Sequence, residues 1–214
     1  MLSLLNNPIS LIIYLISLFV AISIHEFAHA WTAEHLGDPT PRLQGRVTLD
    51  PRAHIDLYGL VFLFLFGFGW GKPVQFDPYN LKNPRRDAAL IGIAGPLSNI
   101  LLALLLAILL RLFIFFHIGV LSAIGYFLFL PMIALNVSLA VFNLIPISPL
   151  DGFKIVGGLL DDEKAREWYG LERYGYIFLL FLILPLVGQR SMIDVIIRPI
   201  SNFLLNLLIP GGSV

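Results

Sequence analysis

Residues 8–35 read PISLIIYLISLFVAISIHEFAHAWTAEH, and this stretch decides the fold class. Residues 1–24 carry no charged side chain, and a helix needs roughly 20 apolar residues to cross the hydrocarbon of a bilayer. Gly37 and then Asp38-Pro39 follow, which is the order of glycine and proline expected just past the end of a helix. The sequence therefore predicts a membrane-spanning helix over 8–35 with ionisable side chains in its second half.

Composition indicates that the rest of the chain is also built for a membrane. Of the 214 residues, 57% are hydrophobic and 13% are charged, about half the charged share of a soluble globular domain. Residues 88–110 and 112–150 carry no Asp, Glu, Lys or Arg, and we expect helices over 88–116 and 119–142. The formal net charge of zero gives no reason to expect nucleic-acid binding. The chain has no cysteine, which excludes disulfides and thiolate metal sites.

Residues 57–71 form an apolar run that is too short for a full crossing and is rich in glycine. Such a run suits a re-entrant or sheet-like element. The predicted fold class is an all-α integral membrane protein, a polytopic helical bundle with a core of three transmembrane helices. To this core we add a membrane-embedded re-entrant or β-hairpin element and additional C-terminal helices.

We expect a single membrane-embedded domain over residues 1–214, with a core at about 8–152 and accessory C-terminal helices at about 153–209. The first apolar stretch lacks the basic start and the small-residue cleavage site of a signal peptide, so we expect it to be retained. A shorter apolar run predicts a helix over 174–189. The last segment, 192–209, either crosses the membrane or lies at its surface, and the sequence leaves both open.

The basic residues gather on one side of this predicted topology. If residues 57–71 do not cross, most of the 14 Lys and Arg fall on one face. The residues concerned are Arg42, Arg46, Arg52, Lys72, Lys82, Arg85, Arg86, Lys154, Lys164, Arg166 and Arg173. The positive-inside rule then predicts a multi-pass protein of the cell membrane with this face toward the cytoplasm.

The polar cluster in the first helix is His25-Glu26-Phe27-Ala28-His29, an H-E-x-x-H motif. Residues four apart lie on one face of a helix, so both imidazoles can reach one metal ion. Neutral imidazoles suit Zn²⁺, which activates a bound water, and Glu26 can accept its proton as general base. Ionisable groups inside a membrane helix are costly and mark function by default, which favours this interpretation over a chance match.

Two acidic residues and one histidine near the motif compete as third ligand. His35 completes a pattern close to that of metzincins, but Thr32 stands where that pattern needs a glycine. A straight helix also places His35 about 15 Å along the axis from His25. Asp50 and Asp56 have a spacing like that of thermolysin-like enzymes, yet they lie in a loop rich in Pro and Arg, where turn formation is favoured.

Asp151 is the favoured third ligand. It closes the segment Asn143-Leu-Ile-Pro-Ile-Ser-Pro-Leu-Asp151-Gly152, in which Pro146 and Pro149 break a membrane helix. Backbone groups freed in this way are tolerated only where protein or a watery cavity surrounds them. For Asp151 to meet the histidines, helices 8–35 and 119–142 must run in the same direction, which the predicted topology allows.

Several motifs together resemble the site-2 protease family of intramembrane zinc metalloproteases, over nearly the whole chain. The blocks that carry the resemblance are His25–His29 with the following Ala30–Asp38, Gly45–Pro51 leading to His54–Asp56, Gly69–Val74, Gly95–Asn99 and Asn143–Gly152. An ordered series of this kind is more specific than the zinc motif alone. The chain resembles a compact form of the family, without PDZ-like or CBS-like domains.

The resemblance implies a function and a set of site residues. His25, His29 and Asp151 would bind one Zn²⁺ per chain, Glu26 would be the catalytic base, and Asn143 would line the site and position the scissile carbonyl or stabilise its oxyanion. The substrates would be transmembrane proteins or peptides in the lipid bilayer. The glycine-rich region 57–76 would form a hairpin that pairs with an unwound substrate by strand addition. The oligomeric state stays open.

Other polar residues receive structural interpretations. We expect the small residues of Gly95–Asn99 to allow close helix packing, and Asn99 and Asn136 to hydrogen-bond across helices. His54 is interpreted as a locally bonded loop histidine rather than a ligand.

Two alternative functions remain at this point. A membrane metal transporter would also carry intramembrane His and Asp, but at several depths. An inactive relative that binds clients without cutting them would have no use for Glu26.

Overall fold

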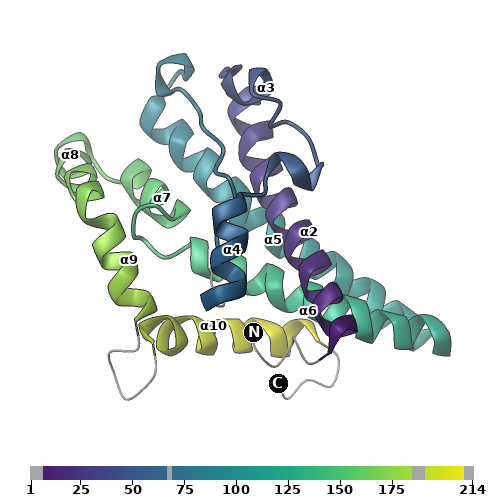
Figure 1. The fold of residues 1–214 in the computed structure, drawn as a ribbon. Coiled ribbons are helices and arrows are strands. Elements are labelled where there is room, and N and C mark those ends of the chain that lie inside the picture. The colour runs from purple at the N-terminus through teal and green to yellow at the C-terminus, as the bar shows by residue number, and fades with distance from the viewer. Residues whose placement is uncertain (1–6, 67–68, 185–190, 210–214) are drawn as a thin grey trace.

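The computed structural model describes residues 7–66, 69–184 and 191–209, and its regular elements in these ranges are helices (Figure 1). The long ones are α2 (Pro8–His35), α5 (Pro84–Phe115) and α6 (Gly119–Asn143). The shorter ones are α3 (Thr40–Leu43), α4 (Leu57–Phe66), α7 (Asp151–Leu159), α8 (Asp162–Gly170), α9 (Gly175–Ile183) and α10 (Met192–Leu208), with single 3₁₀ turns at Pro51–Ala53, Pro78–Asn80 and Glu172–Tyr174. The three long helices are long and apolar enough to cross a membrane, as predicted.

Helix α2 has the predicted bounds, and local chemistry sets both ends. The Asn7 side chain accepts a hydrogen bond from the Ser10 amide at 3.2 Å, and Pro8 occupies the first helical position, where its missing N–H costs nothing. At the other end Gly37 adopts a φ of 111°, which glycine reaches without strain, and the Asp38 amide donates to the Ala33 carbonyl at 3.0 Å.

Helix α5 runs antiparallel to α2. The Ile91 carbonyl lies beside His29 and the Asn99 side chain beside the Ala21 carbonyl, so residue numbers rise along one helix as they fall along the other. The helix begins four residues before the predicted start, because Pro84 opens a polar first turn that the apolar run did not reveal.

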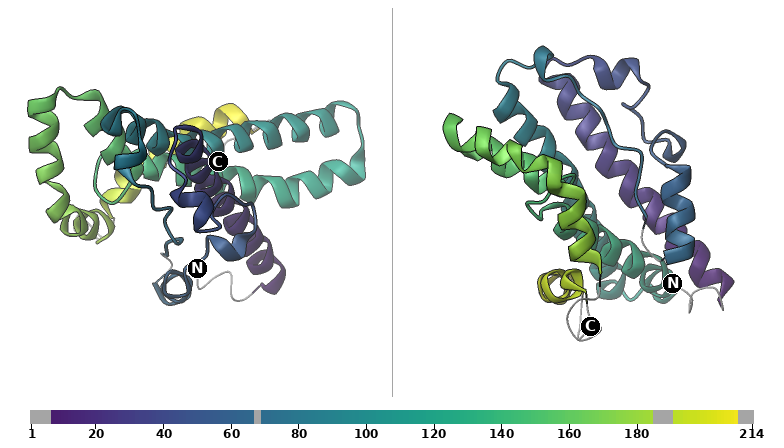
Figure 2. Two further views of the ribbon diagram at one scale, coloured as in Figure 1. Left: turned by 90° about the horizontal axis from the view of Figure 1, so that it is seen from above. Right: turned by 60° about the vertical axis from the view of Figure 1, so that its left-hand side comes forward.

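Helix α6 returns antiparallel to α5, and the two form a long hairpin (Figure 2). Asn136 of α6 pairs with Asn99 in the middle of α5, and Leu110 packs over Gly125 closer to the turn that joins the two helices. Since α5 is antiparallel to both neighbours, α2 and α6 run in the same direction, as the expected meeting of Asp151 with the histidines requires.

The described core lies between α5, α6 and the C-terminal helices. Its buried members include Leu106, Ile133, Val137 and Leu205. Away from this core, large apolar side chains stay exposed along α2, α5 and α6, among them Ile9, Ile12 and Ile16, which share one face of α2. Such apolar outer faces suit contact with lipid rather than water.

Residues 57–71 differ from the predicted hairpin. Leu57–Phe66 is a ten-residue helix, about 15 Å long, and the described part of the return segment runs extended beside it with one antiparallel bridge, between Ile55 and Gly71. The β-hairpin is therefore not confirmed. An isolated ten-residue helix is too short to cross a bilayer, in keeping with the expectation that this run does not span.

The C-terminal part folds as several shorter helices. Helix α7 packs on α5, α8 and α9 follow at the edge of the bundle, and α10 lies across its foot against α6 (Figure 1). Ile197, Ser201 and Leu205 form the buried face of α10. Helix α9 ends at Ile183, and the rest of the predicted helix 174–189 falls largely outside the described residues.

Candidate metal centre

One face of α2 carries both histidines of the motif in a buried row. Ser17, Ala21, His25, His29 and Ala33 follow one another at intervals of four residues, and all are buried. We call this row the ligand stripe. The two histidine side chains are only 5% and 7% exposed, and their Nε2 atoms lie 3.0 Å apart. The stripe thus presents two ring nitrogens to one point between the helices.

Asp151 reaches the same point from a distant part of the chain. Its Oδ2 atom lies 3.0 Å from His25 Nε2 and 3.1 Å from His29 Nε2. The residue occupies the first position of α7, directly after the proline-containing segment. A Cβ on Gly152 would lie 2.3 Å from the Leu144 carbonyl oxygen, so glycine is what lets the segment fold back closely enough to deliver the carboxylate. The predicted meeting of Asp151 with His25 and His29 is present.

An asparagine network fixes the orientation of His25. One proton of the Asn99 amide is donated to the Ala21 carbonyl at 3.0 Å and the other to Asn136 Oδ1 at 2.8 Å. Asn99 Oδ1 can then only accept, and it lies 2.7 Å from His25 Nδ1. His25 therefore carries its proton on Nδ1, which leaves the Nε2 lone pair facing His29 and Asp151.

His29 is held in the same way by the backbone of α5. Its Nδ1 lies 2.6 Å from the Ile91 carbonyl oxygen, an acceptor that only a protonated Nδ1 can satisfy. A Cβ at Gly95 would lie 2.4 Å from His29 Nε2, so this glycine leaves room for the imidazole ring. The Gly95–Asn99 block does serve helix packing, and the surface it packs against is the histidine pair.

The three converging atoms have the chemistry of a cation site. Both Nε2 atoms present lone pairs, the third atom is a carboxylate oxygen, and all lie within 4.8 Å of one another. Three acceptors without a donor among them would repel unless a cation or added protons lay between them. Two imidazoles and one carboxylate are a ligand set that Zn²⁺ takes in catalytic sites, with a fourth position left open. The residues present therefore fit a zinc ion.

Lys154 approaches the outer side of this cluster. Its Nζ atom lies 3.6 Å from Oδ1 of Asp151, the oxygen that does not face the histidines, and 5.7 Å from the centre of the Phe76 ring. The lysine side chain is about one-third exposed, so it lies between the buried carboxylate and the extended segment that contains Phe76.

Glu26 lies beside the cluster but outside it. It is half-buried, and its Oε2 accepts a hydrogen bond from the Val74 amide at 3.0 Å. The Arg46 guanidinium donates to the carbonyls of Ala53 and Lys72, which joins two loops next to Glu26. Burial lowers the pKa of Arg46, and the Glu26 carboxylate opposes that change.

The residues that were set aside as ligands lie elsewhere. His35 bonds to the Trp31 carbonyl at the exposed end of α2, and Asp50 pairs with Arg52. Asp56 accepts the Gly59 amide at the start of α4. His54 is fully buried, and its Nε2 lies 2.8 Å from the Thr48 carbonyl oxygen, while burial lowers its pKa.

Asn143 occupies the last position of α6, where its amide donates to the Leu139 carbonyl at 3.0 Å within the same helix. This bond does not test the predicted role of Asn143 in the site, which stays a prediction.

Asn99 and Gly95 are the site residues that sequence reasoning missed. Gly95 was assigned to packing and Asn99 to a hydrogen bond across helices, which its bond to Asn136 confirms, but neither was connected with the histidines. Asn99 orients His25, and Gly95 makes space for His29. A signal was present, because an amide in the middle of an uncharged membrane helix needs a buried partner.

Comparison with known proteins agrees with this geometry. The model of peptidase family M50 matches residues 13–184. "Putative zinc metalloprotease YwhC" of Bacillus subtilis (strain 168) is 39% identical over 184 residues, which cover 84% of this chain and 84% of the relative. "Putative zinc metalloprotease Rip2" of Mycobacterium tuberculosis (strain H37Rv) is 36% identical over 172 residues, 77% of this chain and 64% of the relative.

A more distant relative comes from an archaeon. "Zinc metalloprotease MJ0392" of Methanocaldococcus jannaschii is 28% identical over 212 residues, which cover 94% of this chain and 50% of the relative. No solved structure matches the chain. Since the family model spans most of the chain and YwhC is similar over most of its own length, the chain belongs to peptidase family M50, the site-2 protease family that its motifs resemble.

Proposed function

We propose that this chain is a zinc endopeptidase that cuts membrane-anchored proteins within or at the edge of the bilayer. The observation that carries the proposal is the convergence of His25 Nε2, His29 Nε2 and Asp151 Oδ2, at 3.0–3.1 Å from one another. The first two lie on a helix long and apolar enough to span a membrane. A metal-binding ligand set inside such a helix supports proteolysis at membrane depth.

In this proposal His25, His29 and Asp151 hold one Zn²⁺ per chain. The ion, when bound, would supply Lewis acidity that activates a water and polarises the scissile carbonyl. The chain contributes the orientation of the ligands. Asn99 and the Ile91 carbonyl keep both Nδ1 atoms protonated, so each imidazole offers Nε2 without first losing a proton.

Glu26 acts as the general base. It follows His25 in the chain, and the Val74 amide holds its Oε2, which orients the carboxylate next to the ligand cluster. A base in this place can take a proton from the attacking water and pass it to the leaving amine. Asn143 is proposed to line the same site and to assist the scissile carbonyl or its oxyanion.

The extended segment after α4 is proposed to bind the substrate backbone. Residues 69–74 follow a short apolar helix. In this segment the Lys72 amide donates to the His54 carbonyl, and the Val74 amide donates to the Glu26 carboxylate. An unwound substrate could pair with such a segment by strand addition, which gives affinity with little demand on sequence. The distribution of Lys and Arg supports an active site toward the cytoplasmic side of the cell membrane.

A metal transporter is the less favoured function. It would need ligand groups at several depths, and in the described part of the chain one group of His and Asp converges.

The proposal is tested by Glu26→Gln in the purified protein, with Glu34→Gln as the matched control. Glu34 is on the same helix but pairs with Arg42 away from the cluster. Glu26→Gln should retain about one zinc per chain and lose cleavage of a membrane-anchored reporter by roughly 10²–10⁴-fold, the usual contribution of a general base. Undiminished cleavage by Glu26→Gln, or a wild-type protein that binds no zinc, would refute the proposal.

A further inference from the structure

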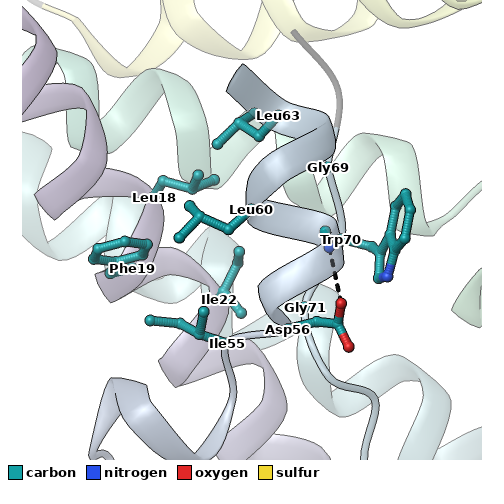
Figure 3. Close-up of a pocket in the computed structure, with 11 residues that line it drawn as sticks. Leu18, Phe19, Ile22, Ile55, Asp56, Leu60, Leu63, Gly69, Trp70 and Gly71 are labelled. Atoms are coloured by element: carbon teal, nitrogen blue, oxygen red, sulfur yellow. Dashed lines mark hydrogen bonds between the residues drawn. The ribbon is translucent and has the colours of Figure 1, made fainter. Parts of the chain in front are cut away.

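A second row of α2 residues faces the short helix α4 instead of α5. Leu18, Ile22 and Glu26 follow one another at intervals of four, each one position after a member of the ligand stripe. We call them the pocket stripe. Leu18 and Ile22 line an apolar pocket between α2 and α4 (Figure 3). Glu26 therefore continues the wall of this pocket toward the metal centre.

We propose that this pocket binds an apolar side chain of the substrate, about two residues from the bond that is cut. The inference rests on the proposed function and adds a determinant of which sequences are cut. Ile22 lies one turn from Glu26, about 6 Å along the helix axis. An extended peptide advances about 3.3 Å per residue, so a substrate whose scissile bond faces Glu26 places a side chain two residues away at Ile22.

Gly71 connects the pocket to the catalytic carboxylate. A Cβ at this position would lie 2.9 Å from Ile22 Cγ2 and 4.0 Å from Glu26 Oε1. Glycine at position 71 thus lets the extended segment lie against Ile22 and close to Glu26, where the wall of the pocket meets the proposed base. Gly71 belongs to the same extended segment that is proposed to pair with the substrate backbone.

The lining chemistry selects an apolar side chain. The aliphatic and aromatic lining residues are Leu18, Phe19, Ile22, Ile55, Leu60, Leu63 and Trp70. Asp56 also lines the pocket, but its Oδ1 already accepts the Gly59 amide at 2.8 Å, and Figure 3 shows this bond on the side away from Leu18 and Phe19. An anionic substrate side chain would find no cation among these walls and would be repelled by the Asp56 carboxylate, so its burial would be costly.

The size of the pocket distinguishes a side chain from a lipid chain. The cavity has a volume of about 40 Å³. By the same measure one water needs at least about 10–15 Å³, so the room suffices for about three such groups. That is the bulk of a valine or leucine side chain, and much less than a lipid acyl chain requires.

The test changes the pocket and the substrate together. Leu60→Ala enlarges the pocket and Leu60→Phe fills it. Leu57→Ala is the matched control, since Leu57 is on the same helix, 70% exposed and outside the lining. The substrates are single-span reporters with Ala, Val, Leu, Phe or Asp at each position within three residues of a cut site mapped by mass spectrometry. The measured quantity is kcat/KM for each pair.

At one substrate position, Leu60→Ala should raise the ratio of kcat/KM for Phe over Val by about tenfold or more, the effect of a few methylene groups in an apolar pocket. Leu60→Phe should favour Ala by a similar factor, and Leu57→Ala should leave the ratios unchanged.

Equal effects of a Leu60 variant on all reporters would assign the pocket to packing or lipid and overturn the inference. Unchanged ratios would also overturn it, while leaving the protease function intact. Failure of the wild type to cut any reporter would instead remove the proposed function and the pocket's role with it.

Discussion

The two stripes of α2 differ by one residue in register and face different surroundings. The ligand stripe packs against α5 and α6, and its members other than histidine are Ser and Ala, which let helices approach closely. The pocket stripe is half-buried and faces α4 and the extended segment 69–74. In the proposed function one face of the helix would hold the metal, and the other would stay accessible beside Glu26. The proposal thus assigns metal binding and substrate binding to two neighbouring faces of one helix.

This comparison predicts that the largest loss follows from changing a ligand itself. Asp151→Ala should lower zinc affinity by more than about 100-fold, because loss of the groups that merely orient ligands already costs about 10–100-fold. Cleavage should fall with the bound metal. Zinc content after dialysis and chelator competition would measure the effect.

Asp50→Ala is the control for this change. Asp50 was weighed as a ligand from its spacing, but it is exposed and paired with Arg52. It should retain zinc and activity. Zinc loss in Asp50→Ala together with zinc retention in Asp151→Ala would reverse the assignment of the third ligand.

The long helices of this fold follow from local pattern. Helix α2 has the predicted bounds, and α6 differs by one residue, because unbroken apolar stretches and their caps are written in the adjacent sequence. Residues 57–71 are the exception. Glycines favoured a sheet-like interpretation, yet the part of the run between Gly59 and Gly67 is uniformly apolar and forms a helix. Gly59 instead allows close contact, since a Cβ there would lie 2.0 Å from the Trp70 carbonyl oxygen.

The ligands of the candidate site could be chosen from sequence, but their support could not. His25 and His29 are neighbours on a helix turn, and Asp151 stands out after two prolines in an uncharged stretch. The sequence indicates that Asn99 needs a buried partner. That this partner is the Nδ1 proton of His25 depends on how α5 crosses α2, which neither helix shows by itself. The same holds for the Val74 amide that meets Glu26, since this contact depends on the path of a loop.

The next largest effect should come from the support of the ligand stripe. Asn99→Leu removes the acceptor of the His25 Nδ1 proton and leaves Asn136 and the Ala21 carbonyl without their partner. We expect zinc affinity to fall about 10–100-fold while the protein remains folded. Isothermal titration of the metal-free protein with zinc would measure the change.

Asn143→Leu makes the contrast sharper. Asn143 bonds within its own helix, so its replacement should leave zinc affinity unchanged and, if it assists the scissile carbonyl, lower kcat. An equal loss of zinc affinity in both asparagine variants would contradict the claim that Asn99 supports zinc binding by orienting His25.

The smallest effect is expected at the loop end of α2, where Asp38 anchors the residues that lead into α5. This fully buried carboxylate accepts bonds from the Thr40 amide and hydroxyl, the Asp77 amide and the Asn80 side chain. In Asp38→Asn one of these donors would face an amide NH₂ group. We expect the free energy of unfolding to fall by about 1–2 kcal/mol, with zinc affinity unchanged. Asp161→Asn, at the exposed start of α8, should change little, because asparagine caps a helix as well as aspartate does.

The stability difference between wild type and Asp38→Asn should also depend on pH. Burial alone would raise the pKa of Asp38, but the bonds from Thr40, Asn80 and the Asp77 amide outweigh burial and hold the pKa below its ordinary value. A carboxyl with a lower pKa in the folded state stabilises the fold above the unfolded-state pKa of about 3.9, and this contribution is lost as pH falls through the folded-state pKa. Thermal unfolding in detergent should therefore show the full difference at pH 7 and a narrowing one below about pH 4. A difference that stayed constant down to pH 3 would contradict the lowered pKa of Asp38. Loss of zinc from Asp38→Asn at pH 7 would show that the loop end and the ligand stripe are not independent.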